Sequence, residues 1–274
     1  METTGPPTAR AISIAGSDPS GGAGIQADVV TFAALGVHGM GCVTALTVQD
    51  TRGVHATRAV EPEFVAAQLE ALLEDLGADA LKTGMLGGPE VVLAIARTLR
   101  AHGTPALVCD PVLASTGGVS LLGPDLRAGL EALRRELLPL TQVLTPNLHE
   151  AALLLDWEPA RSAEAPADTC RALLDLGPRA VILTGGHSGG TSSDDLLFDG
   201  AEFTRLSAPR IETRNSHGTG CAFSAALSAH LARGDDLLAA ARGAKAFVTG
   251  ALEGARGRNL GQGSGPLDLT WSWR

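Results

Sequence analysis

Short apolar segments alternate with longer amphipathic segments along the chain from residue 11 onwards. Apolar residues recur at helical spacing in the longer segments, whereas β-branched and apolar residues follow one another in the shorter ones. Strands are expected over 11–15, 42–48, 80–83, 106–109, 142–144 and 180–183. Helices are expected between them, over 25–35, 62–76, 89–101, 124–137, 148–155 and 167–176. Repeated βα units of this kind predict a mostly parallel sheet with helices on both faces.

The pattern changes after Gly185. Short pieces around 196–198 and 203–206 predict a small antiparallel edge, and helices over about 218–231 and 236–252 complete the fold. We expect one domain over 11–253, a disordered tail over 1–10 and a glycine-rich tail over 254–274. The second tail is expected to pack loosely on the surface, although Trp271 and Trp273 could anchor it.

The composition limits the kinds of partner. Among 274 residues there are 34 glycines, and 30 acidic residues outnumber 21 basic ones, which gives a net charge of −9. No basic stripe is present, so we expect no nucleic-acid partner. No apolar run reaches about 18 residues and residues 1–10 lack the apolar core of a signal peptide, so we expect no membrane partner and a cytoplasmic location. The four cysteines lack metal or disulfide spacing, and the G-x-x-x-x-G-K-[ST] phosphate loop is absent.

Glycine-rich loops follow most of the predicted strands, at the sheet edge where α/β proteins bind their ligands. In NSHGTGC, Gly218 and Gly220 stand directly before an amphipathic helix. The N–H groups of Gly218, Thr219, Gly220 and Cys221 would converge there on a phosphate or on a phosphoryl group in transfer. Cys221 lies in the first turn, where we expect its pKa to fall towards neutral pH. Alternatively the glycines only shape a turn and Cys221 is a small buried residue, and spacing alone does not decide between these interpretations.

Acidic and amide side chains near the strand ends could hold a cation. Asn147 and Glu150 stand three apart at the start of a helix, where they could bind Mg²⁺ at the phosphates of ATP, directly or through water. The two residues alone, however, favour an ordinary helix start with a carboxylate in its first turn. Asp110 ends an apolar strand and could serve as a metal ligand or a base, or simply cap a turn.

The first loop, over 16–24, admits two interpretations. Gly22, Gly24 and Ala27 have the G-x-G-x-x-A spacing of a dinucleotide site, but the loop before them is longer than that motif requires. We therefore favour a flexible loop over a small substrate, with Asp28 one turn into the helix. Gln49 ends the second strand with an amide that could read a heteroaromatic edge, although a lone glutamine is more often a solvated turn residue.

Taken together, the segments resemble one family. They are AGSDPSGGAGIQAD, VTALTVQDTRGV, KTGML, DPVL, TPNLHEA, TGGH and NSHGTGCAFSAA, in this order over about 11–266. This set is similar to the hydroxymethylpyrimidine and phosphomethylpyrimidine kinases of thiamine biosynthesis, in the ribokinase-like superfamily. The resemblance implies a three-layer αβα sandwich with a mostly parallel central sheet and a small antiparallel edge. It also implies ATP- and Mg²⁺-dependent phosphorylation of 4-amino-5-hydroxymethyl-2-methylpyrimidine, followed by phosphorylation of the monophosphate.

The resemblance also implies roles for individual residues. Cys221 would take or relay the hydroxyl proton beside the catalytic glycines Gly218 and Gly220. The pyrimidine would be bound by Gln49, Asp28, Gly16, Ala23, Met85 and Val112. ATP would be bound by Thr184, Gly186, Thr219 and Lys245. The metal would be organised by Asp110, Asn147 and Glu150.

Two positions depart from the family pattern. Many members carry lysine where this sequence has Thr116 and Thr184, so two mobile cations near the phosphates are missing. We expect slower turnover or stricter Mg²⁺ dependence, which restoring both lysines would reverse. Lys82 and Lys245 are the only lysines in the sequence, and both match the pattern.

The same segments leave other functions open. A pyridoxal or pyridoxine kinase of the same superfamily is the nearest alternative, followed by a non-catalytic pyrimidine-binding relative and, more distantly, a nicotinamide-dependent oxidoreductase. We expect the chain to act on a small-molecule pyrimidine and ATP, as a homodimer.

Overall fold

A mixed β-sheet forms the centre of the computed structural model, which describes residues 8–113, 121–185 and 190–273. In this part of the chain the sheet has nine strands, in the order β3-β2-β1-β4-β5-β6-β7-β8-β9. Their bounds are β1 Arg10–Ser17, β2 His38–Asp50, β3 Gly53–Ala59, β4 Ala80–Thr83, β5 Ala106–Cys109, β6 Val143–Leu144, β7 Ala180–Thr184, β8 Ser192–Phe198 and β9 Phe203–Pro209. The six adjacent strands β2, β1, β4, β5, β6 and β7 run parallel to one another. Strand β3 pairs antiparallel with β2 at one edge of the sheet. Strands β8 and β9 extend the other side, where β8 pairs antiparallel with β7 and β9 with β8. The expected mostly parallel sheet with an antiparallel edge is confirmed.

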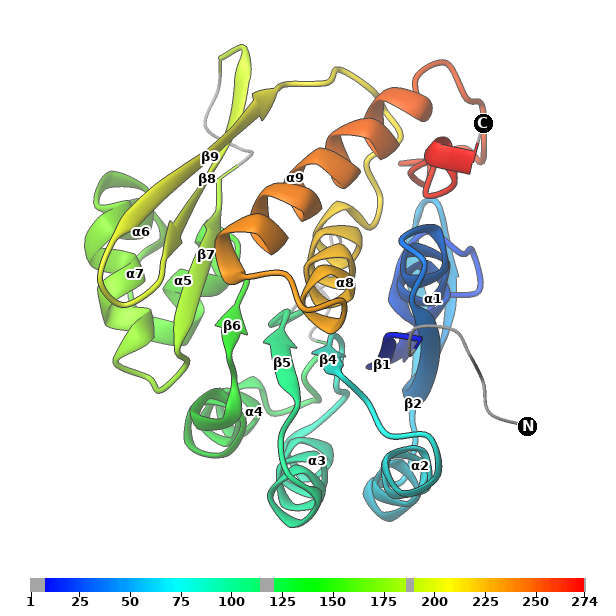
Figure 1. Cartoon of the computed structure of the whole chain (residues 1–274), viewed down its shortest axis with the longest axis vertical. Coiled ribbons are helices and arrows are strands. Elements are labelled where there is room, and N and C mark those ends of the chain that lie inside the picture. Colours follow the sequence, from blue (N-terminus) through cyan, green and yellow to red (C-terminus); the bar gives the residue numbers. More distant parts are fainter. Residues whose placement is uncertain (1–7, 114–120, 186–189, 274) are drawn as a thin grey trace.

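Helices cover both faces of this sheet (Figure 1). On one face lie α1 Gly24–Ala34, α8 Thr219–Ala232 and α9 Leu237–Gly254. On the other lie α2 Pro62–Asp75, α3 Pro89–His102, α4 Leu126–Ala132, α5 Leu148–Leu155 and α7 Pro166–Leu174, with the short α6 Pro159–Glu164 beside α5. Among the described residues one large apolar cluster fills the space between the sheet and α2, α3, α4, α5 and α7. A second large cluster and a smaller third one lie on the face covered by α1, α8 and α9. The chain thus forms the three expected layers.

The central strands are buried on both faces. Every residue of β4 and β6 is buried, as are nearly all residues of β5 and β7. The sequence of a strand that is covered on both faces is a continuous run of apolar residues, and the ends of that run mark the ends of the strand. For this reason the predicted bounds of 80–83 and 106–109 match the structure. The helix predicted over 148–155 also has the observed bounds.

Two elements lie outside the predicted pattern. No element was predicted over Gly53–Ala59, because most of the side chains of β3 are exposed and carry no apolar periodicity. It forms by antiparallel pairing with β2, whose Leu46 and Val48 remain exposed. The predicted helix over 124–137 begins later, at Leu126, and turns into a π-helical segment over Leu133–Leu137.

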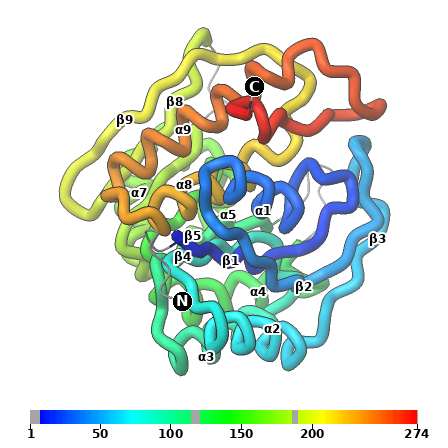
Figure 2. Tube along the Cα trace, turned by 45° about the vertical axis from the view of Figure 1, so that its right-hand side comes forward, coloured from blue at the N-terminus to red at the C-terminus, as the bar shows by residue number. Residues whose placement is uncertain are grey.

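Both ends of the domain are more ordered than the sequence predicts. Arg10 already belongs to β1, and its guanidinium lies 3.0 Å from the Asp79 carboxylate. At the other end Leu267 and Leu269 are buried, and the Trp271 ring lies 6.4 Å from that of Phe247 in α9. The C-terminal segment runs alongside α9 (Figure 2). Residues 265–270 are therefore packed, against the expectation of a loose tail, whereas most of 256–264 is exposed as expected. Trp271 contacts α9 as an anchor would, whereas Trp273 is 61% exposed.

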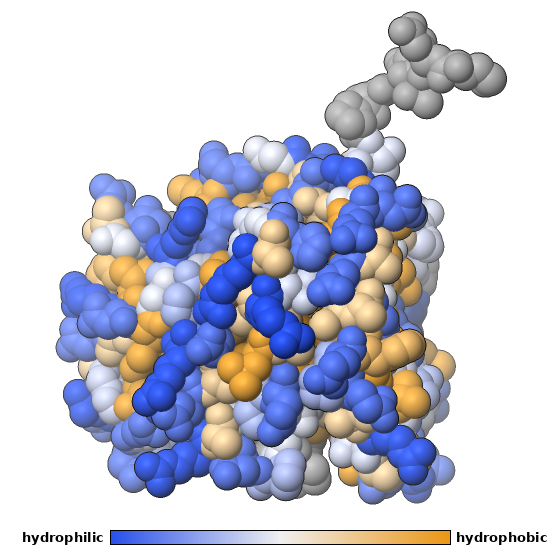
Figure 3. Space-filling model, turned by 90° about the horizontal axis from the view of Figure 1, so that it is seen from below, coloured by the Kyte–Doolittle hydropathy of each residue, from blue (hydrophilic) through white to orange (hydrophobic). Residues whose placement is uncertain are grey.

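The face formed by α2, α3 and α4, at the bottom of Figure 1, is chemically mixed. It carries hydrophilic side chains with apolar ones scattered among them (Figure 3). No helix within the described ranges combines the length and apolar content needed to cross a bilayer. The loops that could carry chemistry lie at the carboxyl ends of the parallel strands.

Candidate active site

The amino end of α8 forms an open cradle of backbone donors. Gly218, the N-cap, has a left-handed φ of 83°, and a Cβ there would overlap the Gly22 carbonyl oxygen. A Cβ on Gly220 would meet no atom within 4 Å, so the space in front of it is open. The first helical bond runs from the Ala222 N–H to the Gly218 carbonyl, at 2.8 Å. The N–H groups of Gly220 and Cys221 come before that bond and are placed to receive an anion.

Cys221 stands in the first turn of α8 and is partly exposed, whereas Cys42, Cys109 and Cys170 are buried. The Asp110 carboxylate and the backbone N–H of Gly24 lie beside its thiol. Burial raises the pKa of Cys221 to about 12, Lys82 opposes this increase, and the carboxylates of Asp110 and Asp28 add to it. The expected lowering of this pKa is therefore wrong, and the resting thiol is protonated.

Alkylation of Cys221 tests this protonation state. Because only the thiolate reacts, its modification by iodoacetamide should accelerate about tenfold per pH unit between pH 7 and pH 10. Rates would be measured by mass spectrometry of the peptide that contains Cys221. The Cys221→Ser variant reports any background from the three buried cysteines. A rate that levels off below pH 8 would show a lowered pKa instead.

A buried ion pair lies behind this cradle. Asp28 and Lys82 both have 0% of their surface exposed, and the Lys82 Nζ lies 2.9 Å from the Asp28 carboxylate. The Ser13 hydroxyl donates to the same carboxylate at 2.5 Å. Burial opposes the charge on Lys82, but Asp28 and its other acidic neighbours raise the pKa of the ammonium above its usual range. The expectation that Asp28 contacts the substrate is wrong, because its side chain has no accessible surface.

Asp110 and Glu150 form a pair of neighbouring carboxylates. The Asp110 Oδ2 lies 3.9 Å from the Lys82 Nζ and accepts a hydrogen bond from the Ser224 hydroxyl at 3.0 Å. Burial and the proximity of Asp110 together raise the pKa of Glu150 to about 8, and burial also raises the pKa of Asp110. Two neighbouring buried carboxylates, one of which raises the pKa of the other, fit a site for a dication.

Asn147 serves a structural role. Its side-chain oxygen accepts hydrogen bonds from the N–H groups of His149 and Glu150, both at 2.9 Å. The Glu150 carboxylate accepts in return from the Asn147 N–H at 3.0 Å, which completes a capping box for α5. We therefore correct the expectation that Asn147 ligates the metal, because both lone pairs of its oxygen are in use. Within the described ranges no three acidic, cysteine or histidine side chains converge as a metal cluster.

Most of the residues expected around the pyrimidine lie at the adjoining strand ends. A Cβ on Gly16 would come within 3.0 Å of the Met85 sulfur, so these two residues are packed together. The N–H of Ala23 donates to Asp18 at 2.9 Å, and the N–H of Val112 donates to the Asp110 carbonyl at 2.9 Å. Ala23, Met85 and Val112 are partly exposed, as a residue that touches a ligand must be.

The residues expected to bind ATP lie in different elements and have different partners. Thr219 begins α8, whereas the Thr184 hydroxyl donates to the Pro146 carbonyl at 3.2 Å. The Lys245 ammonium lies 2.7 Å from Asp195, whose other oxygen accepts from the Gly185 N–H at 3.0 Å. Lys245 is therefore paired and fixes the loop after β7, and its binding of ATP stays a prediction. Gly186 and Thr116 lie outside the described residues.

The sequence interpretation also missed the link between Asp18, His217 and Gln49. The His217 Nε2 lies 2.9 Å from an Asp18 carboxylate oxygen and 3.2 Å from the Gln49 carboxamide. Asp18 is 3% exposed. The only signal for this contact was the position of all three residues at the carboxyl ends of strands or in glycine loops.

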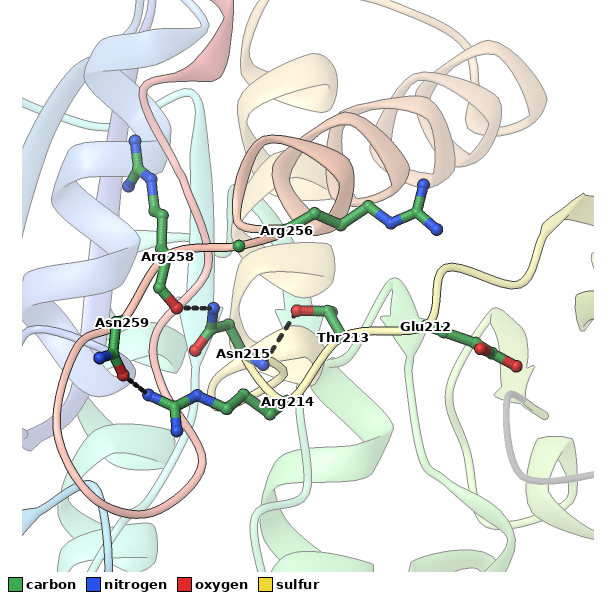
Figure 4. A pocket seen from close by; sticks show the side chains of 8 residues that line it. Glu212, Thr213, Arg214, Asn215, Arg256, Arg258 and Asn259 are labelled. Atoms are coloured by element: carbon green, nitrogen blue, oxygen red, sulfur yellow. Dashed lines mark hydrogen bonds between the residues drawn. The ribbon is translucent and has the colours of Figure 1, made fainter.

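A cavity of about 500 Å³ lies beside the segment that follows α9. Its lining residues are Glu212, Thr213, Arg214, Asn215, Arg256, Gly257, Arg258 and Asn259 (Figure 4). Asn215 donates to the Ala255 and Arg258 carbonyls at 2.7 and 2.9 Å, and Arg214 is bonded to Asn259. This lining joins the loop before α8 to the C-terminal segment.

Comparison with known proteins identifies the family. Residues 18–268 match the family model described as phosphomethylpyrimidine kinase. The chain is 48% identical over 266 residues to the hydroxymethylpyrimidine/phosphomethylpyrimidine kinase of Rhizobium meliloti, covering 97% of this chain and 98% of that protein. The protein of the same name from Escherichia coli is 43% identical over 264 residues, with coverage of 96% and 98%.

Solved structures agree on the fold. Pyridoxal kinase from Staphylococcus aureus in complex with AMP-PCP and pyridoxal superposes with a TM-score of 0.87 at 33% identity, covering 98% of this chain and 96% of that one. Phosphomethylpyrimidine kinase from Clostridium difficile superposes with a TM-score of 0.76 at 35% identity, covering 89% and 99%. The fold is thus ribokinase-like, and the chain belongs to the phosphomethylpyrimidine kinase family.

Proposed function

We propose that this protein transfers phosphate from ATP to 4-amino-5-hydroxymethyl-2-methylpyrimidine and then to the resulting monophosphate. The observation that carries this proposal is the open cradle of N–H groups at α8, with the Cys221 thiol in its first turn and Asp110 beside it. The sequence relatives that cover nearly the whole chain carry the names of these two activities.

The cradle supplies electrostatic stabilisation. The N–H groups of Gly220 and Cys221 donate to the phosphoryl oxygens, on which negative charge is spread during transfer. Fixed backbone donors need no reorientation at that moment. They also replace mobile cations, which suits a chain with threonine at positions 116 and 184.

Cys221 handles the proton of the attacking hydroxyl group. Because the resting thiol is protonated, it must pass its own proton on as the sulfur takes up the hydroxyl proton. The Asp110 carboxylate, which lies beside the thiol, gives that proton a destination. We therefore favour a relay over direct abstraction by a preformed thiolate.

Asp110 and Glu150 would hold Mg²⁺, directly or through water molecules. Bound there, the ion would neutralise charge on the phosphates of ATP. Each carboxylate has two oxygens, so Asp110 can face both the cation and the thiol. The homodimer, the cytoplasmic location and the effect of restoring lysine at 116 and 184 stay predictions.

Pyridoxal kinase activity is the second candidate, because structures of pyridoxal kinase superpose on this chain with TM-scores of 0.87. A coupled assay of ADP release with each alcohol separates the two activities. We expect a higher kcat/KM with the pyrimidine alcohol, and a higher value with pyridoxal would favour the alternative. If neither alcohol causes release of ADP, the protein would be a non-catalytic pyrimidine-binding relative. If NADH but not ATP raises the melting temperature, the protein would be an oxidoreductase.

Replacing Gln49 with alanine should raise the KM for the pyrimidine alcohol about 10- to 100-fold, because a hydrogen-bonded amide is lost from the ring edge. The KM for ATP should stay within about twofold, since no ring contact with ATP is lost. Steady-state kinetics with each substrate varied in turn measure both values.

Gln68→Ala is the matched control, because that amide holds the backbone of Val43 from α2. It should lower stability without separating the two KM values. Equal increases in both KM values for Gln49→Ala would contradict its role as the residue that binds the ring.

A further inference from the structure

His217 stands where three segments of the chain meet. Its Nε2 lies 2.9 Å from an Asp18 carboxylate oxygen and 3.2 Å from the near terminal atom of the Gln49 carboxamide. Its backbone N–H donates to the Gly265 carbonyl at 3.1 Å. Its ring packs so closely on Gly22 that a Cβ there would overlap it. The imidazole is therefore held in place from several sides.

The partners of Asp18 decide which tautomer His217 adopts. The Asp18 carboxylate accepts from the N–H groups of Ser20 and Ala23, both at 2.9 Å. Burial opposes the charge of Asp18, but these bonds and the contact with His217 lower its pKa below the usual range. An ionised carboxylate carries no hydrogen, so the hydrogen shared with His217 sits on Nε2. His217 is the donor in this contact.

The Gln49 carboxamide is then fixed at both of its ends. The structure places the Gln49 amide nitrogen towards His217 and the amide oxygen towards Thr47, and a half-turn of the amide exchanges the two atoms. An imidazole N–H cannot accept a hydrogen bond, so the atom that faces His217 must be the oxygen, which shares the Nε2 hydrogen with Asp18. The other end lies 3.4 Å from the Thr47 hydroxyl oxygen, and that hydroxyl donates its hydrogen to the Ser17 carbonyl at 2.9 Å. The Thr47 oxygen can therefore only accept, so the NH₂ group of Gln49 must face it. The contact with His217 and the contact with Thr47 therefore each require the same orientation of the Gln49 amide.

We propose that His217 is a positioning residue that holds the Gln49 carboxamide with its oxygen towards α8 and its NH₂ group towards Thr47. In this orientation one lone pair of the oxygen and one N–H remain for the substrate. The ring edge must therefore present a donor on the His217 side and an acceptor on the Thr47 side. His217 thus determines specificity without touching the ring, an inference that rests on the proposed function because it takes Gln49 to face the pyrimidine.

The tautomer of His217 can be measured directly in the wild-type protein. Long-range ¹H–¹⁵N correlation spectra of ¹⁵N-labelled protein distinguish a protonated from an unprotonated Nε2. The His217→Phe variant assigns the signal, because its cross-peaks must disappear. We expect Nε2 to carry the hydrogen at pH 7.5. An unprotonated Nε2 would reverse the Gln49 amide and overturn the proposal.

Kinetics of the same variant test the consequence. Phenylalanine keeps the ring that packs on Gly22 but cannot donate, so the KM for the pyrimidine alcohol should rise about tenfold. The KM for ATP should not change, and the preference for the pyrimidine alcohol over pyridoxal should fall by about the same factor. His102→Phe is the matched control, since His102 pairs with Glu74 between two outer helices.

The outcomes separate this inference from the proposed function. If the wild-type protein does not phosphorylate the pyrimidine alcohol, the proposed function fails, whatever the tautomer. If it does, and His217→Phe changes neither the KM for the pyrimidine alcohol nor the preference, only the positioning role of His217 fails. Equal changes with both alcohols and ATP would likewise show a structural role alone.

Discussion

Replacing Cys221 with alanine is expected to lower kcat by about two to four orders of magnitude, because the hydroxyl group of the substrate loses its proton acceptor. The KM for ATP should change little, since the backbone N–H groups at α8 remain. The melting temperature should stay close to that of the wild type, because the residue is partly exposed and a small side chain replaces it. Single-turnover and steady-state rates with MgATP measure the loss.

Cys170→Ala is the matched control for this variant. Cys170 is fully buried beneath β8, so its replacement removes a thiol and leaves a small cavity far from the cradle. It should lower the melting temperature while kcat stays within about twofold, since cavity formation affects stability rather than transfer. A kcat near the wild-type value in Cys221→Ala would remove Cys221 from the proton path.

Replacing Gly218 with alanine should have the second large effect, a fall in kcat/KM of about two to three orders of magnitude. The φ of 83° is unfavourable for alanine, and its methyl group would overlap the Gly22 carbonyl oxygen. The first glycine loop and the start of α8 must then separate, which moves the N–H donors away from the transferred group. Steady-state kinetics and thermal unfolding measure both consequences.

Gly36→Ala distinguishes backbone strain from this clash. Gly36 has a similar φ of 75°, but a Cβ there would meet no atom within 4 Å. Both variants should lose about 1 kcal/mol of stability from strain, and only Gly218→Ala should lose activity. Equal kinetic losses would mean that the contact between the two loops does not position the cradle.

The layers of the fold follow from local patterns in the sequence. Strands β4 and β5 and helix α5 have the predicted bounds because burial on both faces, or a capping box, marks their ends within the local sequence. Strand β3 has no such mark, since its side chains are exposed and its pairing with β2 forms it. Patterns of apolar residues therefore predict what is buried and miss an exposed edge.

The chemistry of the site depends on contacts between distant segments. The helix start at Cys221 predicts a lowered pKa, yet burial in the folded chain raises it, and the carboxylates that add to this increase, Asp110 after β5 and Asp28 in α1, stand more than a hundred residues earlier. Asp28 looks accessible in a loop-to-helix segment, but Lys82 from β4 pairs with it in the interior. The anion cradle could be placed from local sequence, whereas the protonation states around it could not.

The most direct measurement is the end-point product of the pyrimidine alcohol with excess MgATP, followed by ³¹P NMR. The proposed function predicts that the monophosphate forms first and is then converted to the diphosphate, with ADP released at both steps. Recovery of the unchanged alcohol would contradict kinase activity on this substrate, and a reaction that stops at the monophosphate while ATP remains would contradict the second transfer.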